Sequence, residues 1–152
     1  MTYIIGENSS GKTHKMLEEA NPGDSLFVSV IDMDRLKYVN DNFGHAEGDF
    51  GVSLVCSVAM KILKSGEICV RAGGDEFYIM GVGKYEEEEL AQRVQEFNNY
   101  MQTAAKASGK PYPISASIGC AIAPIKDNFH VMSVVNKADE NMYKSKMERK
   151  KQ

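Results

Sequence analysis

The sequence predicts one α/β domain of the α+β type, in which helices flank a central β-sheet. The first observation is that strand-like and helix-like segments alternate from residue 25 to residue 150. The second is that 152 residues, 43% of them hydrophobic and 26% charged, suit a single globular domain with its own core. Because no internal repeat or low-complexity segment divides the chain, we expect residues 1–152 to form one domain.

The first strong strand is predicted over residues 25–31, where the run Ser-Leu-Phe-Val-Ser-Val-Ile is almost wholly β-favouring. This run ends in Asp32-Met33-Asp34, so it brings carboxylates to the C-terminal edge of the sheet, where α/β proteins bind ligands. We interpret Asp32 as a ligand-binding acid. For Asp34 we favour the N-cap of a helix that begins near Arg35.

The elements that follow are predicted from periodicity. Residues 45–63 and 86–105 each place apolar side chains about four positions apart, as one-faced helices do. Gly109-Lys110-Pro111 ends the second of these helices, and residues 114–118 then alternate between apolar and polar as a strand does. A last helix is predicted over residues 130–148.

The most informative segment is residues 71–77, Arg-Ala-Gly-Gly-Asp-Glu-Phe, between the strand-like runs 68–70 and 77–80. Gly73 and Gly74 fall where a two-residue hairpin needs backbone angles that glycine adopts easily. Asp75 and Glu76 then lie at a turn between two buried strands, and a bound cation would explain why two acids occur there. The alternative is an acidic turn that is simply solvated. Together with Asp32, these acids predict a Mg²⁺ site for phosphoryl or nucleotidyl transfer.

Three polar residues of the predicted helices are candidates for binding a nucleotide. Lys37 can add positive charge beside phosphates, although for this residue alone we favour a solvated helix lysine. Guanine presents two adjacent donors that a carboxylate accepts together, which suits Asp49, and a side-chain amide such as Asn40 suits the guanine carbonyl. Both residues also fit helix caps.

Charge and composition exclude several classes of protein. A net charge of −3 argues against nucleic acid as a partner, and no apolar run has the length of a membrane span. The three cysteines show neither a zinc motif nor a disulfide framework, so we expect buried, reduced thiols and a cytoplasmic protein.

Several motifs occur in an order that resembles the GGDEF domain of diguanylate cyclases. They are residues 31–37, residues 40–45 with Gly48-Asp49, residues 71–77, Ser117-Ile118-Gly119, and Ala138-Asp139 with Tyr143 and Lys146. The resemblance covers residues 25–150 and leaves residues 1–24 as a divergent N-terminal segment. Within that segment, Gly6 to Thr13 fit a P-loop pattern after Tyr3-Ile4-Ile5. A P-loop NTPase that uses residues 27–32 as its acidic strand is therefore a remote alternative.

The resemblance implies a nucleotidyl-cyclase-like fold with a ferredoxin-like core, built on a five-stranded and mostly antiparallel sheet. It also implies an enzyme that condenses two GTP molecules into cyclic di-GMP, releases pyrophosphate and acts as a homodimer. Such domains usually follow a sensory or receiver module, so a separate partner of that kind is expected. A domain of the same family that binds GTP without turnover, as a sensor, is the main alternative.

The resemblance also implies roles for individual residues. Mg²⁺, or Mn²⁺, would be bound by Asp32, Asp75 and the backbone carbonyl of Met33. Glu76 is a candidate for metal contact or proton handling, and the glycines of the turn, Gly73 and Gly74, let phosphate approach the backbone. The nucleotide-binding set comprises Asn40 and Asp49 for guanine, Lys37 and Lys146 for phosphates, and Leu36 and Lys150, which stand where phenylalanine and arginine are common.

One departure from the family concerns the product-inhibition site. The family has an Arg-x-x-Asp pattern shortly before the signature turn, and this chain has Lys64-Ser65-Gly66-Glu67 there. Lysine cannot make the two-pronged contact that arginine makes with guanine or phosphate. We therefore expect the product-inhibition site at Lys64 and Glu67 to be degenerate and inhibition to be weak or absent.

Overall fold

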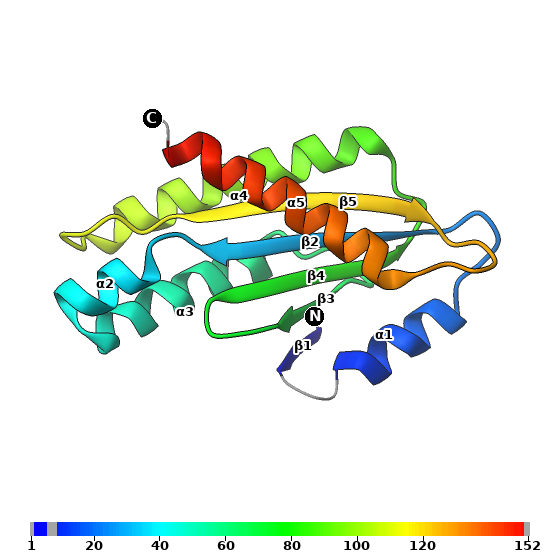
Figure 1. Cartoon of the computed structure of the whole chain (residues 1–152), viewed down its shortest axis with the longest axis horizontal. Coiled ribbons are helices and arrows are strands. Elements are labelled where there is room, and N and C mark those ends of the chain that lie inside the picture. The colour runs from blue at the N-terminus through cyan, green and yellow to red at the C-terminus, as the bar shows by residue number, and fades with distance from the viewer. Residues whose placement is uncertain (1, 6–8, 151–152) are drawn as a thin grey trace.

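The computed structural model describes residues 2–5 and 9–150, and these residues form one five-stranded sheet flanked by helices (Figure 1). The strands are β1 Thr2–Ile5, β2 Ser25–Met33, β3 Ile68–Arg71, β4 Glu76–Gly83 and β5 Ala116–Pro124. Their order in the sheet is β1-β3-β4-β2-β5, with every pair antiparallel except β1 with β3. The predicted five-stranded, mostly antiparallel sheet is thus confirmed.

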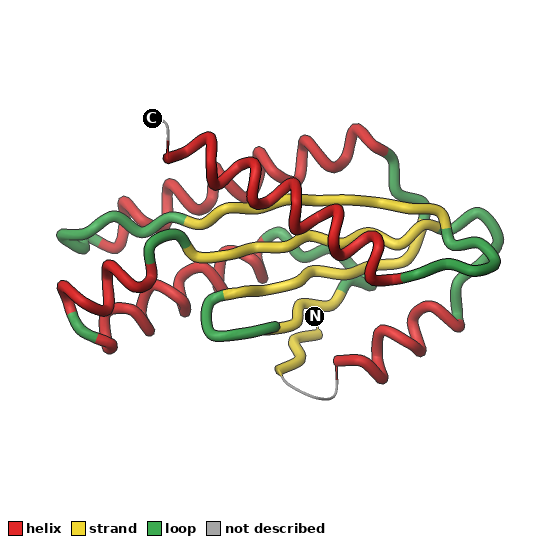
Figure 2. Tube along the Cα trace, viewed as in Figure 1, coloured by secondary structure: helices red, strands yellow, loops and turns green. Residues whose placement is uncertain are grey.

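Helices cover both faces of the sheet (Figure 2). They are α1 Ser9–Glu18, α2 Leu36–Phe43, α3 His45–Lys61, α4 Glu87–Ser108 and α5 Val131–Lys150. Side chains of β2 alternate between two apolar cores, because successive residues of a strand point to opposite faces. Phe27 and Ile31 join the core under α3 and α4, whereas Val28 and Val30 join the core under α5.

The predicted helices and strands agree closely with those observed. α3 starts at His45 as expected, and α4 and α5 start and end within about three residues of the predicted bounds. Glu86 and Glu89 form a reciprocal capping box that starts α4, and Gly109, with a φ of 67°, ends it. The strand predicted over residues 114–118 instead begins at Ala116 and continues to Pro124.

The prediction of a two-residue hairpin at Gly73 and Gly74 is wrong. The connection between β3 and β4 has four residues, 72–75, and the Ala72 N–H donates to the Glu76 carbonyl across its base at 2.9 Å. Neither Gly73 nor Gly74 has a positive φ. A four-residue loop can turn with ordinary backbone angles, so the fold does not call on the conformational freedom of these glycines.

Several segments that are distant in sequence meet at one end of the sheet. Figure 1 shows the C-terminal end of β2, the β3–β4 turn, the start of α2 and the last turns of α5 at this end. In the antiparallel register of β2 and β4, Asp32 is opposite Glu76. Gly119 allows α5 to lie close to β5, because a Cβ there would collide with the Met142 backbone nitrogen.

The N-terminal strand and helix flank the opposite edge of the sheet from β5. β1 pairs with β3, so β3 and β4 separate it from β2, a distance of about 14 Å at the usual strand spacing. The Thr13 hydroxyl donates a hydrogen bond to Met80 Sδ at 3.6 Å. Of the P-loop pattern Gly6 to Thr13, residues 6–8 lie outside the described residues.

Within residues 2–5 and 9–150, no helix is both long and apolar enough to cross a membrane.

Candidate functional site

The carboxyl groups of Asp32 and Asp75 converge at the end of β2. The Met33 N–H donates to the Asp75 carbonyl oxygen at 3.1 Å, which ties the β3–β4 turn to β2. Burial raises the pKa of Asp32 to about 6, and both the charge of Asp75 and a hydrogen bond between the two side chains act in the same direction. Two acids held this close favour a shared proton or a shared cation.

Lys146, from α5, partly neutralises this pair. Its Nζ lies 2.7 Å from Asp32 Oδ2 and 3.9 Å from Asp34 Oδ1. Burial acts to lower the pKa of Lys146, but the hydrogen bond and charge of Asp32, with the charges of Asp34 and Asp75, raise it. One ammonium therefore faces three carboxylates.

Asp34 is a structural acid, and the prediction that it caps a helix is wrong. Its carboxylate is buried and accepts hydrogen bonds from Ser115 Oγ at 2.9 Å, Ser117 Oγ at 2.7 Å and Arg149 Nη1 at 3.2 Å. These three donors satisfy the charge better than the amides of a helix start. The N-cap of α2 is instead Arg35, which has a φ of 58° and makes no side-chain cap.

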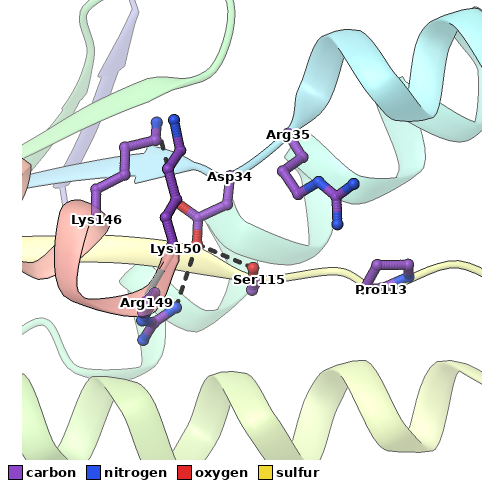
Figure 3. A pocket seen from close by; sticks show the side chains of 7 residues that line it. All are labelled: Asp34, Arg35, Pro113, Ser115, Lys146, Arg149 and Lys150. Atoms are coloured by element: carbon purple, nitrogen blue, oxygen red, sulfur yellow. Dashed lines mark hydrogen bonds and ion pairs between the residues drawn. The ribbon is translucent and has the colours of Figure 1, made fainter. Parts of the chain in front are cut away.

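A cavity of about 550 Å³ opens beside Asp34. Figure 3 shows its lining side chains, of which four are cations: Arg35, Lys146, Arg149 and Lys150. Arg35 and Arg149 were not among the residues predicted from the sequence. Arg149 follows Lys146 by three positions on a helix, a spacing that puts both on one side, so it could have been found. The left-handed backbone that places Arg35 has no signal in the sequence.

The β3–β4 turn, which bears Asp75, is held by Arg71. Its Nε and Nη2 donate to the carbonyl oxygens of Gly73 and Gly74 at 3.1 and 2.6 Å. A Cβ built on either glycine meets no atom within 4 Å. Neither backbone angle nor space within the chain therefore requires glycine at these two positions.

Glu76 lies beside the acid pair. Burial raises the pKa of Glu76, and the charges of Asp139 and Asp75 add to this effect, while a hydrogen bond with Tyr78 opposes it. A carboxyl group with a raised pKa next to a site of negative charge can hold or accept a proton.

Asn40 and Asp49 lie on two helices that pack against each other. Asn40, on α2, touches Gly48, since a Cβ at Gly48 would collide with the Asn40 amide oxygen. Asp49, the next residue on α3, is exposed. Asn40 is half-buried, so of the two residues predicted to bind guanine only Asp49 is exposed to solvent. Leu36, at the start of α2, packs against the core under α3.

Two predicted phosphate ligands differ in their placement. The Lys37 side chain is 91% exposed and pairs with Asp41 at 3.7 Å, one helical turn away, and it does not line the cavity. Lys150 is exposed and does line it. The structure thus brings Lys146 and Lys150 to the site and leaves Lys37 on the surface of α2.

The donor set fits a divalent cation shared with a ligand. In the described part of the chain no group of three His, Cys, Asp or Glu side chains is arranged to hold a metal by itself. Mg²⁺, however, is commonly bound by one or two carboxylates together with substrate phosphates, and Mn²⁺ accepts the same oxygen ligands. Asp32 and Asp75 provide two carboxylates, and the cationic cavity beside them suits the phosphates.

Glu67, predicted to be part of a degenerate product site, faces the interior. It is 3% exposed and accepts hydrogen bonds from Arg93 Nη1 and Nη2, both at 2.8 Å, from the Tyr85 hydroxyl at 2.7 Å and from the Lys64 backbone N–H at 2.9 Å. The Lys64 side chain is exposed. Lys64 and Glu67 therefore do not face a common ligand.

Comparison with known proteins identifies the family. A family model described as "Diguanylate cyclase, GGDEF domain" matches residues 10–152. The chain belongs to the GGDEF family. Diguanylate cyclase A of Treponema denticola is 26% identical over 148 residues, which cover 96% of this chain and 37% of that protein. The biofilm architecture maintenance protein MbaA of Vibrio cholerae is 33% identical over 129 residues, covering 80% of this chain and 16% of that protein.

Solved GGDEF domains share the fold. The GGDEF domain of YfiN (TpbB) from Pseudomonas aeruginosa superposes with a TM-score of 0.79 at 26% identity, over 95% of this chain and 90% of that one. The GGDEF domain of DgcB from Caulobacter crescentus, solved in complex with c-di-GMP, has a TM-score of 0.70 at 25% identity, over 82% and 73%. Although it matches these domains over most of their length, the chain spans only 16 to 37% of the two curated relatives.

Proposed function

We propose that this GGDEF domain is a diguanylate cyclase, which condenses two GTP molecules into cyclic di-GMP and releases two pyrophosphates. The observation that supports this most is the convergence of Asp32 and Asp75 beside a cavity lined by four cations. Paired carboxylates and nearby cations are the parts that nucleotidyl transfer to a hydroxyl group requires. A divalent ion held by Asp32, Asp75 and the Met33 carbonyl would neutralise charge on the reacting phosphate.

Other residues of the site bind the triphosphate and accept a proton. Lys146, Lys150 and Arg35 bind the triphosphate, because their charges face the cavity from two sides. Gly73 and Gly74 leave the backbone of the turn open to a phosphate. Glu76, whose pKa is raised by burial, takes the proton from the attacking 3′-hydroxyl.

Guanine is selected at the junction of α2 and α3. Asp49 accepts the two adjacent donors of guanine, and the Asn40 amide, held against Gly48, bonds its carbonyl or ring nitrogen. Adenine lacks the donor pair, so GTP should bind more tightly than ATP.

Each domain holds one GTP, so two copies must face each other to complete a product ring. Activity should therefore rise more steeply than linearly with protein concentration. The natural setting is the cytoplasm, where GTP is available, and a sensory or receiver partner that brings two copies together is expected to set the rate.

The test is incubation of the purified domain with GTP and Mg²⁺ at several protein concentrations, with pyrophosphate and cyclic di-GMP measured separately. Both products should appear in a ratio of two to one. Asp75→Asn should abolish them, whereas Asp41→Asn, which removes the same charge from the exposed surface of α2, should not.

Other outcomes decide between the alternatives. GTP that binds and stays intact at every protein concentration would replace the cyclase by a GTP sensor. Release of inorganic phosphate that requires Lys12 would favour a P-loop NTPase, which the separation of β1 from β2 makes the weaker candidate. Added cyclic di-GMP should inhibit weakly or not at all, because Glu67 is paired internally with Arg93.

A further inference from the structure

Lys146 is the cation that contacts Asp32 in the described part of the chain. The ammonium is 2.7 Å from Asp32 Oδ2, and the two side chains are only 21% and 18% exposed. Asp34 lies 3.9 Å away, and the charge of Asp75 acts on the same ammonium. Lys146 thus contacts the carboxylate that the proposed divalent cation would share with Asp75.

Lys146 and a divalent cation compete for the same oxygens. Mg²⁺ binds carboxylate oxygens at about 2.1 Å and tolerates little distortion of its ligand shell. An ammonium and a divalent cation that contact the same carboxylate also repel each other strongly at so short a separation. We expect, therefore, that Asp32 holds either the lysine or the metal.

The exchange requires movement of the lysine side chain alone. On one side of Lys146, Asn141 Nδ2 donates to the Cys120 carbonyl at 2.9 Å, and on the other side Arg149 Nη1 donates to the Ala116 carbonyl at 2.6 Å. These bonds fix α5 against β5 at both ends of the segment. The four-carbon stem of the lysine can turn without any shift of the helix.

The cavity offers the displaced ammonium a second position. Lys146 already lines it together with Arg35 and Lys150, and a bound triphosphate would replace the carboxylate as its partner (Figure 3). We propose that Lys146 is the counter-ion of Asp32 in the empty site and yields this carboxylate to the divalent cation. It then binds substrate phosphate, so that metal and nucleotide favour each other's binding.

This exchange deepens the proposed function and rests on it for the identity of the nucleotide. Without nucleotide the lysine opposes metal binding, and with nucleotide it is drawn away from Asp32. By linkage, the factor by which metal tightens nucleotide binding equals the factor by which nucleotide tightens metal binding. The lysine therefore makes each ligand a condition for tight binding of the other.

The first experiment measures Mn²⁺ affinity in the absence of nucleotide by electron paramagnetic resonance. Lys146→Met keeps the length of the side chain and removes the competing charge, so it should bind Mn²⁺ about five- to tenfold more tightly than wild type. Lys150→Met is the matched control, because it removes a charge from the same helix and cavity, and Lys150 makes no ion pair with Asp32 among the described contacts. The control should change the affinity less than twofold.

The second experiment repeats the titration with a GTP analogue that carries a methylene group between the α- and β-phosphates. Wild-type protein should bind Mn²⁺ at least tenfold more tightly when the analogue is present, and Lys146→Met should lose most of this gain. A melting curve with and without Mn²⁺ checks that both variants are folded, and the Mn²⁺-induced rise in Tm should be larger for Lys146→Met.

Two results would overturn the proposal. If Lys146→Met binds Mn²⁺ with unchanged or lower affinity, the lysine does not compete with the metal. If the analogue tightens Mn²⁺ binding by the same factor in Lys146→Met as in wild type, the lysine does not couple the two ligands. Failure of the proposed function is a separate outcome, because Lys146→Met can bind Mn²⁺ more tightly in a domain that forms no cyclic di-GMP. Conversely, product formation with no change in Mn²⁺ affinity refutes the exchange alone.

Discussion

Glu67 and Asp32 each hold a cation at hydrogen-bonding distance, Arg93 at 2.8 Å and Lys146 at 2.7 Å, but the two carboxylates differ in what else surrounds them. Glu67 also accepts bonds from Tyr85 and the Lys64 backbone. Asp32 instead faces a second acid, Asp75. Burial raises the pKa of both, yet the donors around Glu67 outweigh burial and lower it overall, while the pKa of Asp32 stays raised.

The difference separates a structural charge from a binding charge. Arg93 donates two parallel hydrogen bonds to Glu67, so that each carboxylate oxygen of Glu67 accepts a bond from the guanidinium. The same guanidinium lies over the Phe27 ring, 4.5 Å from its centroid. Lys146 offers one ammonium to three acids. A carboxylate that its own protein stabilises incompletely has affinity left for an external cation. Four experiments test this contrast.

The largest effect is expected for Arg93→Met. The substitution leaves Glu67 ionised and unpaired in a buried position, which should lower the free energy of unfolding by about 3–5 kcal/mol. Urea denaturation followed by circular dichroism measures it. Lys137→Met is the control, because Lys137 pairs with Glu140 on the exposed surface of α5 and such pairs contribute less than about 1 kcal/mol. Equal losses of unfolding free energy in the two variants would show that the buried Glu67–Arg93 pair contributes no more to stability than an exposed pair.

Asp32→Asn should have the opposite profile. Product formation should fall by a factor on the order of 10³, as when a group that stabilises reacting charge is removed. Stability should stay the same or rise, because the raised pKa of Asp32 shows that the fold disfavours its ionised form. Pyrophosphate release and a melting curve measure the two quantities. A loss of stability as large as that expected for Arg93→Met would contradict the proposed distinction.

Glycine substitutions extend the contrast to the backbone. Gly74→Ala should leave the Tm unchanged, since the new methyl group meets nothing in the chain, and should weaken GTP turnover about tenfold by crowding the phosphate. Gly119→Ala should destabilise the fold by about 1–3 kcal/mol, because its methyl group would press on the α5 backbone. If Gly74→Ala turned over GTP normally, ligand approach would not explain that glycine.

The smallest effect is in the pH dependence of stability, and the two carboxylates should give opposite signs. Glu67, whose pKa is held below 4.5, stabilises the fold above that pH, and this contribution is lost as pH falls through its folded pKa. Asp32, with a pKa near 6 instead of 3.8, contributes most below pH 3.8 and loses this contribution as pH rises through 6.

Denaturation of Glu67→Gln and Asp32→Asn between pH 3 and pH 7 isolates the two contributions. In Glu67→Gln, the free energy of unfolding should no longer show the part of its fall at acid pH that is due to Glu67. In Asp32→Asn, it should no longer show the decrease between pH 3.8 and pH 6 that is due to Asp32. A wild-type curve that differs from neither variant in its window would refute both assignments.

Much of the fold was predictable because it depends on local patterns. Periodicity located the helices and strands, and acids at the ends of two strands predicted that Asp32 and Asp75 would meet. The partners of Asp34 were not predictable, because Ser115, Ser117 and Arg149 come from distant segments. The angles of Gly73 and Gly74 were missed because the loop is longer than the sequence indicated.

Side-chain direction set a second limit. Lys37 follows Asp32 closely in sequence, yet its position on α2 turns it toward Asp41 and solvent. Arg149 was not predicted, because its hydrogen-bond partners, Asn98 on α4 and the Ala116 carbonyl on β5, lie far from it in the sequence. Proximity along a chain is a poor guide to a site that is assembled from the ends of several elements.

The bonds from α5 to β5 have a consequence for the exposed edge of the sheet. β5 is an outer strand, and an outer strand with free carbonyls invites another chain to extend the sheet. Arg149 and Asn141 already occupy the carbonyls of Ala116 and Cys120. This edge of the sheet is therefore closed to an added strand at those two points, which limits edge-to-edge association of chains through β5.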